Sequence, residues 1–399
     1  MNRNKIFYAC SGTADLIKSY KHWEKGEHDP HEVSITFSGQ ILEYCKASNS
    51  KIFMVSPHAN GDSFRDDDAV IEHRPKPKVP FVGSGLSYHL GEFSYGFILL
   101  WKALRFRSDI ALVDSGATYY FMLFLFRAFG IKVIPILHNT LWPAGFPPRK
   151  LSGRVIQWCD RWFFRYGANA ILSVSKECEK QVLELCGRKV EKKLVQFRAQ
   201  FHKAYFDNIS LPPAHEQRPF KVMFIGRVEV FKGVLDILDM AAQLNEKHPN
   251  EYEWVICGTG PALAALQAKA RQKGLTDIVN IPGWVELEEL IELYRDCHIS
   301  IVPTTDGFNE GLAMTAAESA LSGRPVIASG VVPAAGEMPT ACYKAITNDI
   351  NSFVEGIEKI ASDKGLYEQM KLACGKESLQ FLDRTKGLTA MLHQVLPKK

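Results

Sequence analysis

Short apolar runs alternate with helical patterns through the second half of the chain. Strand-like apolar runs are expected at 222–225, 254–257, 278–281, 299–302 and 325–328. Helical patterns fall between them, at 234–244, 263–272, 287–294 and 313–321. This alternation is typical of a parallel, doubly wound α/β sheet with helices on both faces.

The first half follows the same pattern less clearly. Strands are expected at 6–9, 52–55, 110–113, 133–137 and 170–174, whereas residues 56–96 have no clear pattern. Two such sheets in tandem predict two Rossmann-like domains with a ligand cleft between them, because ligands of open α/β sheets bind beyond the carboxyl ends of the strands.

A proline-rich polar stretch at 210–219 marks the expected linker. We therefore predict a first domain at 1–212, a second at 213–380, and a helical C-terminal segment at 381–399. The 399 residues suit two domains, and 46% hydrophobic with 23% charged residues is typical of a soluble globular protein. No run of residues is long and apolar enough to span a bilayer, and the N-terminus lacks the apolar region of a signal peptide.

Charge is distributed unevenly between the halves. Residues 1–213 hold 29 Lys and Arg against 20 Asp and Glu, a balance of +9, so the remainder carries +4 − 9 = −5. The first half would therefore favour anionic partners. This excess is modest and no nucleic-acid-binding module is recognisable, so nucleic-acid binding is a poor hypothesis. No cluster of His and Cys has the spacing of metal ligands, and we predict no metal.

The segment 309–326 is the most informative for chemistry. Gly311 allows a turn after a strand, and a helix should begin there with free backbone amides that suit a phosphate. Glu318 falls on the apolar stripe of that helix and needs a hydrogen-bonding partner. A ribose diol would supply donors, but a nearby Lys, Arg or backbone amide would do so equally, and both interpretations stay open.

Three further segments also end strands of the second sheet, so all four would line one edge. Arg227 and Lys232 follow the first strand, and two cations there suit a diphosphate, although such residues are more often solvated surface. Gly258 and Gly260 form a short turn that is too brief for a dinucleotide fingerprint. At Trp284-Val285 the backbone would read a nucleobase edge, or Trp284 would pack in the core.

The order and spacing of these segments resemble the donor domain of family-four glycosyltransferases, retaining enzymes of the GT-B architecture, over residues 220–330. That family has Gly-Arg, four residues and Lys-Gly, then Gly-x-Gly, then Glu, seven residues and Glu, then Gly-x-Pro-Val. The matching residues here are Gly226, Arg227, Lys232, Gly233, Gly258, Gly260, Glu310, Glu318, Gly323, Pro325 and Val326.

The resemblance implies a role for each residue. Arg227 and Lys232 would bind the donor diphosphate and stabilise it as it leaves, and Glu310 would contact the transferred sugar. Glu318 would bind the ribose hydroxyls, and the amides of Leu312 and Ala313 would touch the phosphates or the sugar. The family more often has glycine at position 313. The methyl group of alanine there would hinder a close approach of the sugar to the backbone.

The first half matches the family less specifically. His138 ends a strand where the family often places a histidine that faces the sugar, although a capping or core histidine would also fit. Ser11 and Gly12 lie at the first strand–helix turn on the acceptor side, where the family often has a longer glycine-rich loop. The C-terminal segment 381–399 would cross back to the first domain, as in the family.

A basic segment with interleaved aromatic residues lies at 149–165. It contains Arg149, Lys150, Arg154, Arg161 and Arg165 around Trp158, Trp162, Phe163 and Phe164. Such a segment is typical of peripheral contact with an anionic membrane. It is equally typical of an amphipathic helix packed on the first domain with solvated arginines.

The resemblance implies a metal-independent, retaining glycosyltransferase without a cofactor. It would move a sugar from a nucleotide-diphosphate sugar to the hydroxyl of a sugar or lipid-linked acceptor, in cell-surface polysaccharide or glycolipid biosynthesis. The expected location is the cytoplasm, including the inner face of the cytoplasmic membrane. Two alternatives stay open, a nucleotide-sugar epimerase of the same architecture and a non-catalytic nucleotide-sugar-binding protein.

Overall fold

The computed structural model describes residues 3–27, 29, 32–78 and 84–396, so the extreme ends of the predicted segments 1–212 and 381–399 lie outside the described residues. The chain divides into two compact units. The first contains residues 1–141, 148–199 and 384–399, and the second contains residues 142–147 and 200–383. The predicted boundary at 212/213 rests on the composition of the linker, whereas this division rests on packing. Residues 200–212 therefore group with the second unit.

The first unit is built on an eight-stranded sheet in the order β4-β5-β3-β1-β6-β7-β8-β9. Its pairs are parallel except for the edge pair of β4 and β5. The strands are β1 (Lys5–Ala9), β3 (Lys51–Ser56), β4 (Ser63–Arg65), β5 (Ala69–His73), β6 (Ile110–Asp114), β7 (Lys132–Leu137), β8 (Ile171–Ser173) and β9 (Leu194–Gln196). The central strands are buried on both faces, which explains their continuous apolar runs.

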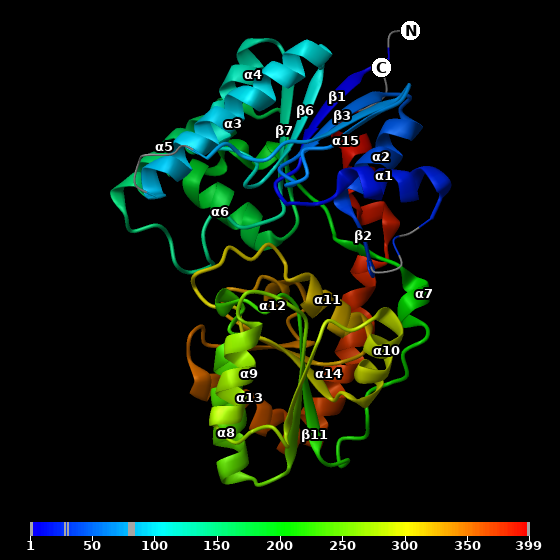
Figure 1. Cartoon of the computed structure of the whole chain (residues 1–399), viewed down its shortest axis with the longest axis vertical. Helices are drawn as coiled ribbons and strands as arrows, with labels where there is room; N and C mark the ends of the chain where they lie inside the picture. The colour runs from blue at the N-terminus through cyan, green and yellow to red at the C-terminus, as the bar shows by residue number, and fades with distance from the viewer. Residues whose placement is uncertain (1–2, 28, 30–31, 79–83, 397–399) are drawn as a thin grey trace. The chain divides into compact units, whose positions relative to one another are not determined.

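Helices cover both faces of this sheet, with α1, α2 and α15 on one side and α3 and α4 on the other (Figure 1). The helices of the unit are α1 (Leu16–Lys25), α2 (Phe37–Ala47), α3 (Ser84–Phe106), η1 (Tyr120–Leu123), α4 (Phe124–Ala128), α5 (Leu151–Trp162), η2 (Phe163–Gly167), α6 (Lys176–Cys186), η3 (Arg188–Lys193), η6 (Arg384–Lys386) and α15 (Leu388–Val395). The C-terminal helix α15 packs on α2, where the backbone amide of Leu388 donates to Oε1 of Gln40 at 2.7 Å.

The stretch 56–96, which the sequence pattern left unassigned, holds β4, β5 and the start of α3. The two strands are short and one is a partly exposed edge, so neither has a long apolar run. The long helix α3 has several exposed apolar side chains, which obscured its amphipathic pattern.

The second unit is a six-stranded, parallel sheet in the order β13-β12-β11-β14-β15-β16. Its strands are β11 (Phe220–Ile225), β12 (Tyr252–Cys257), β13 (Val279–Gly283), β14 (Ile299–Val302), β15 (Val326–Ser329) and β16 (Cys342–Ala345). In sequence order these are strands 3-2-1-4-5-6, the order of a Rossmann fold. The predicted strands of the second half are all present, with shifts of one or two residues at their ends.

The helices of the second unit also lie on both faces of its sheet (Figure 1). They are α7 (Lys203–Phe206), η4 (Val230–Lys232), α8 (Val234–Lys247), α9 (Leu263–Gln272), α10 (Leu287–Asp296), α11 (Met314–Leu321), α12 (Ala334–Glu337), α13 (Ile350–Ser362), α14 (Lys364–Glu377) and η5 (Ser378–Phe381). Two short strands complete the described elements of the chain, β2 (Ser34–Ile35) and β10 (Gln200–Phe201).

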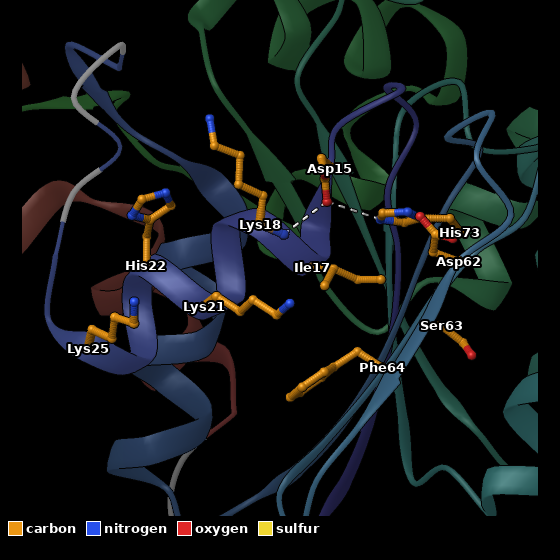
Figure 2. Close-up of a pocket in the computed structure, with 10 residues that line it drawn as sticks. All are labelled: Asp15, Ile17, Lys18, Lys21, His22, Lys25, Asp62, Ser63, Phe64 and His73. Carbon is orange, nitrogen blue, oxygen red and sulfur yellow. Dashed lines mark hydrogen bonds and ion pairs between the residues drawn. The ribbon is translucent and has the colours of Figure 1, made fainter.

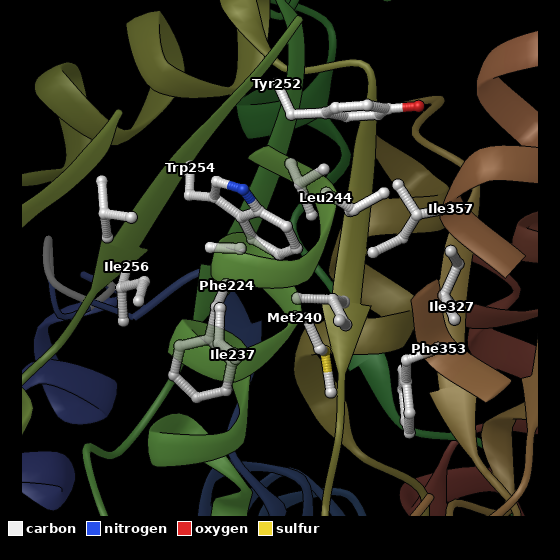
Figure 3. Close-up of a cluster of buried hydrophobic side chains, with 14 of the residues drawn as sticks. Phe224, Ile237, Met240, Leu244, Tyr252, Trp254, Ile256, Ile327, Phe353 and Ile357 are labelled. Atoms are coloured by element: carbon white, nitrogen blue, oxygen red, sulfur yellow. The ribbon is translucent and has the colours of Figure 1, made fainter. Parts of the chain in front are cut away.

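The larger core of the second unit lies between its sheet and α8, α9 and α13. Figure 3 shows Trp254 and Phe353 at opposite ends of this core with Met240 between them, and each is almost completely buried. Burying one large apolar side chain stabilises a fold by roughly 1.5–3 kcal/mol. This packed face fixes the sheet, so the loops at the carboxyl ends of its strands are held in place.

Candidate active site

The order of the second sheet reverses between β11 and β14, which pair in parallel. The chain leaves these two strands toward opposite sides, so their carboxyl ends border a crevice, the place where open α/β sheets bind ligands. Arg227 and Lys232 follow β11, and Glu310 follows β14. Three of the predicted catalytic residues therefore come from the two strands at the switch point.

Lys232 and Glu310 form an ion pair at this edge. Nζ of Lys232 lies 2.6 Å from Oε2 of Glu310, and Oγ1 of Thr304 donates to the same oxygen at 3.1 Å. The side chains of Lys232 and Glu310 are only 16% and 9% exposed. Charge pairs withdrawn from water interact more strongly than exposed pairs, so two residues 78 positions apart hold one another in place.

The ring of Phe308 brings Arg227 and Lys232 together. The guanidinium carbon of Arg227 is 5.5 Å from the ring centroid, and Nζ of Lys232 is 4.2 Å from it. Both distances suit cation–π contact. Arg227 also pairs with Glu229 at 2.9 Å, but its side chain is 60% exposed and therefore accessible to a ligand.

Glycines let the loops of this edge approach one another closely. A Cβ at Gly258, where φ is +130°, would lie 1.8 Å from the carbonyl oxygen of Gly226, and one at Gly260 would lie 2.4 Å from that of Val228. Only glycine fits such close backbone contacts. The predicted glycine turn therefore supports the loop that carries Arg227.

The helix α11 begins at Met314, within one residue of the predicted helical pattern at 313–321. It begins three residues after Gly311, because Ala313 has φ +68° and ends the preceding loop. Such a φ favours glycine, which explains why glycine is the more common residue at this position of the family. The amides of Gly311, Leu312 and Ala313 have no hydrogen-bond acceptor among the described residues, so they are available to a ligand at a helix N-terminus.

Glu318 is buried on α11 and hydrogen-bonded to a neighbouring helix. The hydroxyl of Tyr294, on α10, donates to its Oε1 at 3.1 Å. Tyr294 is fully buried, and its burial and the charge of Glu318 raise its pKa well above the usual value, so it stays a donor. A tyrosine is thus one partner of Glu318, in addition to the ribose, Lys, Arg or backbone amide that the sequence allows.

Trp284 follows β13 at the same edge and is 60% exposed. Core packing, one of the two interpretations of this residue, is therefore wrong. Val285 is half-buried and packs against a small cluster that includes Leu290 and Tyr294. An exposed indole at the end of a strand is available for stacking on a planar ring.

The predicted residues of the first unit lie at the carboxyl edge of its own sheet. Nε2 of His138 is 2.8 Å from Oδ1 of Asp114, and its ring stacks on Phe37 with a centroid distance of 4.1 Å. Ser11 is half-buried and Gly12 is exposed, directly after β1. His138 is therefore a largely buried histidine at the sheet edge, oriented by Asp114 and packed on an aromatic ring.

The structure thus brings Arg227, Lys232 and Glu310 together and places Glu318 and Trp284 on neighbouring elements of the same unit. Sequence reasoning missed Phe308, Thr304 and Tyr294, which hold these side chains. Phe308 stands two residues before Glu310, and an aromatic residue so close to a candidate acid was the available signal. Nothing in the sequence paired Tyr294 with Glu318.

Among the residues that the structure describes, no three His, Cys, Asp or Glu side chains form a cluster that could hold a metal ion. Within the same described ranges, no helix combines the length and apolar character needed to cross a membrane.

Comparison with known proteins gives one family match. Residues 206–374 match the family described as "Glycosyl transferases group 1". The chain is 28% identical over 173 residues to a D-inositol 3-phosphate glycosyltransferase of Corynebacterium diphtheriae, which covers 40% of this chain and 39% of that protein. It is 22% identical to an alpha-D-kanosaminyltransferase of Streptomyces kanamyceticus, over 54% and 57% of the two chains. The chain thus spans about two fifths to three fifths of the length of these curated relatives.

Solved structures resemble the chain over nearly its whole length. Sucrose-phosphate synthase from Thermosynechococcus elongatus gives a TM-score of 0.68 at 14% identity, over 98% of both chains. HepE of Anabaena, solved in complex with UDP, gives 0.64 at 12% identity over the same share of each chain. At such low identity these likenesses establish the fold alone.

Proposed function

We propose that this chain moves a sugar from a nucleotide-diphosphate sugar to a hydroxyl acceptor. Residues 206–374 match the group 1 glycosyltransferases, and the two units have the Rossmann-like folds of the GT-B architecture. The observation that carries this proposal is the set of Arg227, Lys232 and Glu310 around Phe308 at the switch point of the second sheet. HepE is a neighbour of the same fold that was solved with UDP, which supports a nucleotide-sugar donor here.

In this proposal the donor diphosphate binds beside Phe308. Lys232 exchanges its carboxylate partner for a phosphate oxygen, and Glu310, released from Lys232, accepts hydrogen bonds from the transferred sugar. Arg227 turns from Glu229 to the second phosphate, and the amides of Leu312 and Ala313 donate to phosphate or sugar. Glu318, oriented by Tyr294, holds the ribose, and Trp284 stacks on the base.

We further propose that transfer retains the anomeric configuration. The acceptor hydroxyl attacks the anomeric carbon on the face from which the nucleoside diphosphate leaves, and its proton passes to a departing phosphate oxygen. Arg227 and Lys232 stabilise the negative charge on that leaving group, and this stabilisation supplies most of the rate enhancement. Their two charges supply what a divalent cation supplies in other enzymes, so the proposed reaction requires none. On the acceptor side, Ser11, Gly12 and His138 line the edge of the first sheet.

The decisive experiment is product analysis with a panel of nucleotide sugars and the purified chain. Release of a nucleoside diphosphate together with a glycosylated acceptor supports transfer. Conversion of the donor sugar without any acceptor would instead establish the epimerase alternative. Donor binding without turnover of any kind, under conditions where acceptors are present, would establish the non-catalytic alternative.

The proposed partners include a sugar or lipid-linked acceptor and an anionic membrane surface. An apolar face along α5 and η2 consists of Leu151, Val155, Trp158, Trp162 and Tyr166, which are between 43% and 76% exposed. These positions recur on one side of the helix. Arg149, Lys150 and Arg154 beside it are exposed and have no ion pair with a described carboxylate. Exposed aromatics with free cations support contact with anionic lipid.

The two other predicted aromatics, Phe163 and Phe164, are fully buried and take no part in this face. Flotation with anionic and zwitterionic vesicles tests the proposal. We expect salt-sensitive binding to anionic vesicles that is lost in Trp158→Ser/Trp162→Ser, but kept in Leu372→Ser, which changes an exposed residue on α14. Equal binding of all variants, or a dimer that the tryptophan substitutions dissociate, would contradict a membrane role.

A further inference from the structure

A cavity of about 600 Å³ opens in the first unit between α1 and strands β4 and β5 (Figure 2). Its volume falls in the range of small-molecule sites. The lining residues are Asp15, Ile17, Lys18, Lys21, His22, Lys25, Asp62, Ser63, Phe64 and His73. Asp15 lies in the loop after β1 and His73 is the last residue of β5. The cavity therefore lies at the carboxyl edge of the first sheet, where ligands of such sheets bind.

Two cations of this cavity lack a counter-charge among the described residues. Lys21 and Lys25 lie four residues apart on α1 and line the same cavity. Neither forms an ion pair with a described carboxylate, whereas Lys18 pairs with Asp29 at 2.6 Å. Like charges at this helical spacing repel one another. An anion bound near both ammonium groups would offset this repulsion.

The opposite wall has polar groups suited to hydroxyls. The side chain of His73 is 1% exposed, and its Nε2 lies 3.6 Å from Oδ1 of Asp15, longer than a hydrogen bond. Neither ring nitrogen has a hydrogen-bond partner among the described residues. A buried polar group without a hydrogen-bond partner lowers the stability of the fold by about 1–3 kcal/mol. A bound hydroxyl or water is therefore expected to form a hydrogen bond with His73. Figure 2 shows Asp15, Asp62 and His73 grouped together, away from Lys21 and Lys25.

An apolar surface lies between these two groups. In Figure 2, Ile17 lies in the middle of the cavity and the ring of Phe64 forms its lower side. The ring of Phe64 also lies 6.0 Å from Nζ of Lys21. Most of the cavity wall is polar or charged, and Ile17 and Phe64 supply its apolar surface. Such a wall suits a polar, charged ligand better than an apolar one.

We propose that this cavity binds a phosphorylated polyhydroxy compound, with its phosphate between Lys21 and Lys25 and its hydroxyls against Asp15, Asp62 and His73. This compound is the acceptor of the transfer reaction, and that last step rests on the proposed function. The phosphate belongs either to a free sugar phosphate or to the headgroup of a lipid. Both present the same chemistry to the two lysines.

The test measures binding to the full chain in two arms. Calorimetric titration with glucose 6-phosphate, with glucose as the neutral control, tests the free ligand. Flotation with phosphatidylcholine vesicles, with and without phosphatidylinositol 4-phosphate, tests the headgroup. We expect binding in at least one arm, with roughly tenfold or greater weakening in Lys21→Ala/Lys25→Ala. The arm that responds identifies the source of the phosphate.

Two control variants make the test decisive. Lys189→Ala/Lys192→Ala removes two exposed lysines of η3 and should bind as the wild type does. Lys232→Ala should also keep binding, because it alters only the proposed donor site. Three results would overturn the proposal. The first is equal binding of glucose and glucose 6-phosphate together with no binding to the lipid. The others are an equal loss of ligand binding in the η3 variant and a loss of ligand binding only in Lys232→Ala.

The proposed function is tested separately by the response to UDP. UDP should raise the melting temperature of the wild type and of Lys21→Ala/Lys25→Ala alike. A chain that binds the phosphate ligand but never responds to UDP would refute the donor site and leave this cavity site standing.

Discussion

At the scale of single residues, the site is held by partners that neutralise its charges before any ligand arrives. Lys232 lies between Glu310 and Phe308, and Arg227 lies between Glu229 and the same ring. Keeping these cations paired avoids leaving charge unsatisfied in a half-buried loop. A diphosphate carries more negative charge than one carboxylate, so it competes well for both cations.

Lys232→Ala tests the leaving-group role at this scale. Loss of one preorganised cation from a transition state typically lowers kcat about 10²- to 10³-fold, and we expect a decrease of this size measured with the donor that turns over. Lys269→Ala is the matched control, because Lys269 pairs with Asp239 at the same 2.6 Å in the same unit but away from the edge. Near-normal kcat in Lys232→Ala would refute the assignment.

Ala313→Gly tests the backbone before α11. Ala313 adopts φ +68°, a conformation that costs a residue with a side chain roughly 1–3 kcal/mol. We expect the glycine variant to unfold at higher urea concentration, by about 1 kcal/mol, because part of the gain is offset by the larger entropy of glycine in the unfolded chain. Ala316→Gly in the same helix should destabilise instead. A lower free energy of unfolding for Ala313→Gly would contradict the prediction that the backbone of Ala313 is strained.

At the scale of elements, the sheet order decides which loops meet. Strands β11 and β14 are adjacent although β12 and β13 separate them in sequence. Their loops therefore meet at the switch point and bring Lys232 to Glu310. The helices α10 and α11 are linked by the hydrogen bond from Tyr294 to Glu318. Tyr294 on α10 therefore orients the carboxylate of Glu318 on α11.

Tyr294→Phe tests this positioning role. Without the hydroxyl, Glu318 loses a buried hydrogen bond and is less well oriented, so we expect the donor KM to rise about threefold to tenfold while kcat changes little. Tyr252→Phe, which removes the hydroxyl of a buried tyrosine on β12, is the control and should leave KM unchanged. An equal fall in kcat, or an unchanged KM, would show that Tyr294 does not position the donor.

At the scale of the whole molecule, buried titratable groups couple stability to pH. His298 is fully buried beside Phe220, and its Nδ1 accepts a hydrogen bond from the amide of Lys221 at 3.0 Å. Burial lowers the pKa of His298 to about 4, below the value of about 6.5 in an unfolded chain. Its contribution to stability is therefore complete above pH 6.5 and is lost as the pH falls toward 4.

We accordingly expect acidification from pH 7 to pH 5 to lower the free energy of unfolding by about 2 kcal/mol through this histidine alone. Urea titrations at both pH values, for the wild type and for His298→Asn, isolate the effect because the asparagine oxygen can accept the same amide. The pH dependence of the variant should be smaller by that amount. Identical pH dependence of the two proteins would assign the coupling to other groups.

The sequence alone predicted the α/β class, the strands of the second half and the motif residues at their ends, because apolar periodicity and strand-end glycines are local features. It also located Lys232 and Glu310 as candidates. It could not predict residues 56–96, whose short edge strands leave no clear period, nor the left-handed backbone of Ala313 before α11.

Only the tertiary structure decided how these candidates are held. The Lys232–Glu310 pair, the Tyr294–Glu318 bond and the lysine-lined cavity join residues that are distant in sequence, and a strand order of 3-2-1-4-5-6 is needed to bring the first pair together. Exposure of Trp284 and burial of Phe163 and Phe164 were likewise set by packing. Local patterns specify which elements form. Contacts between elements follow from the spatial order of the strands in the sheet.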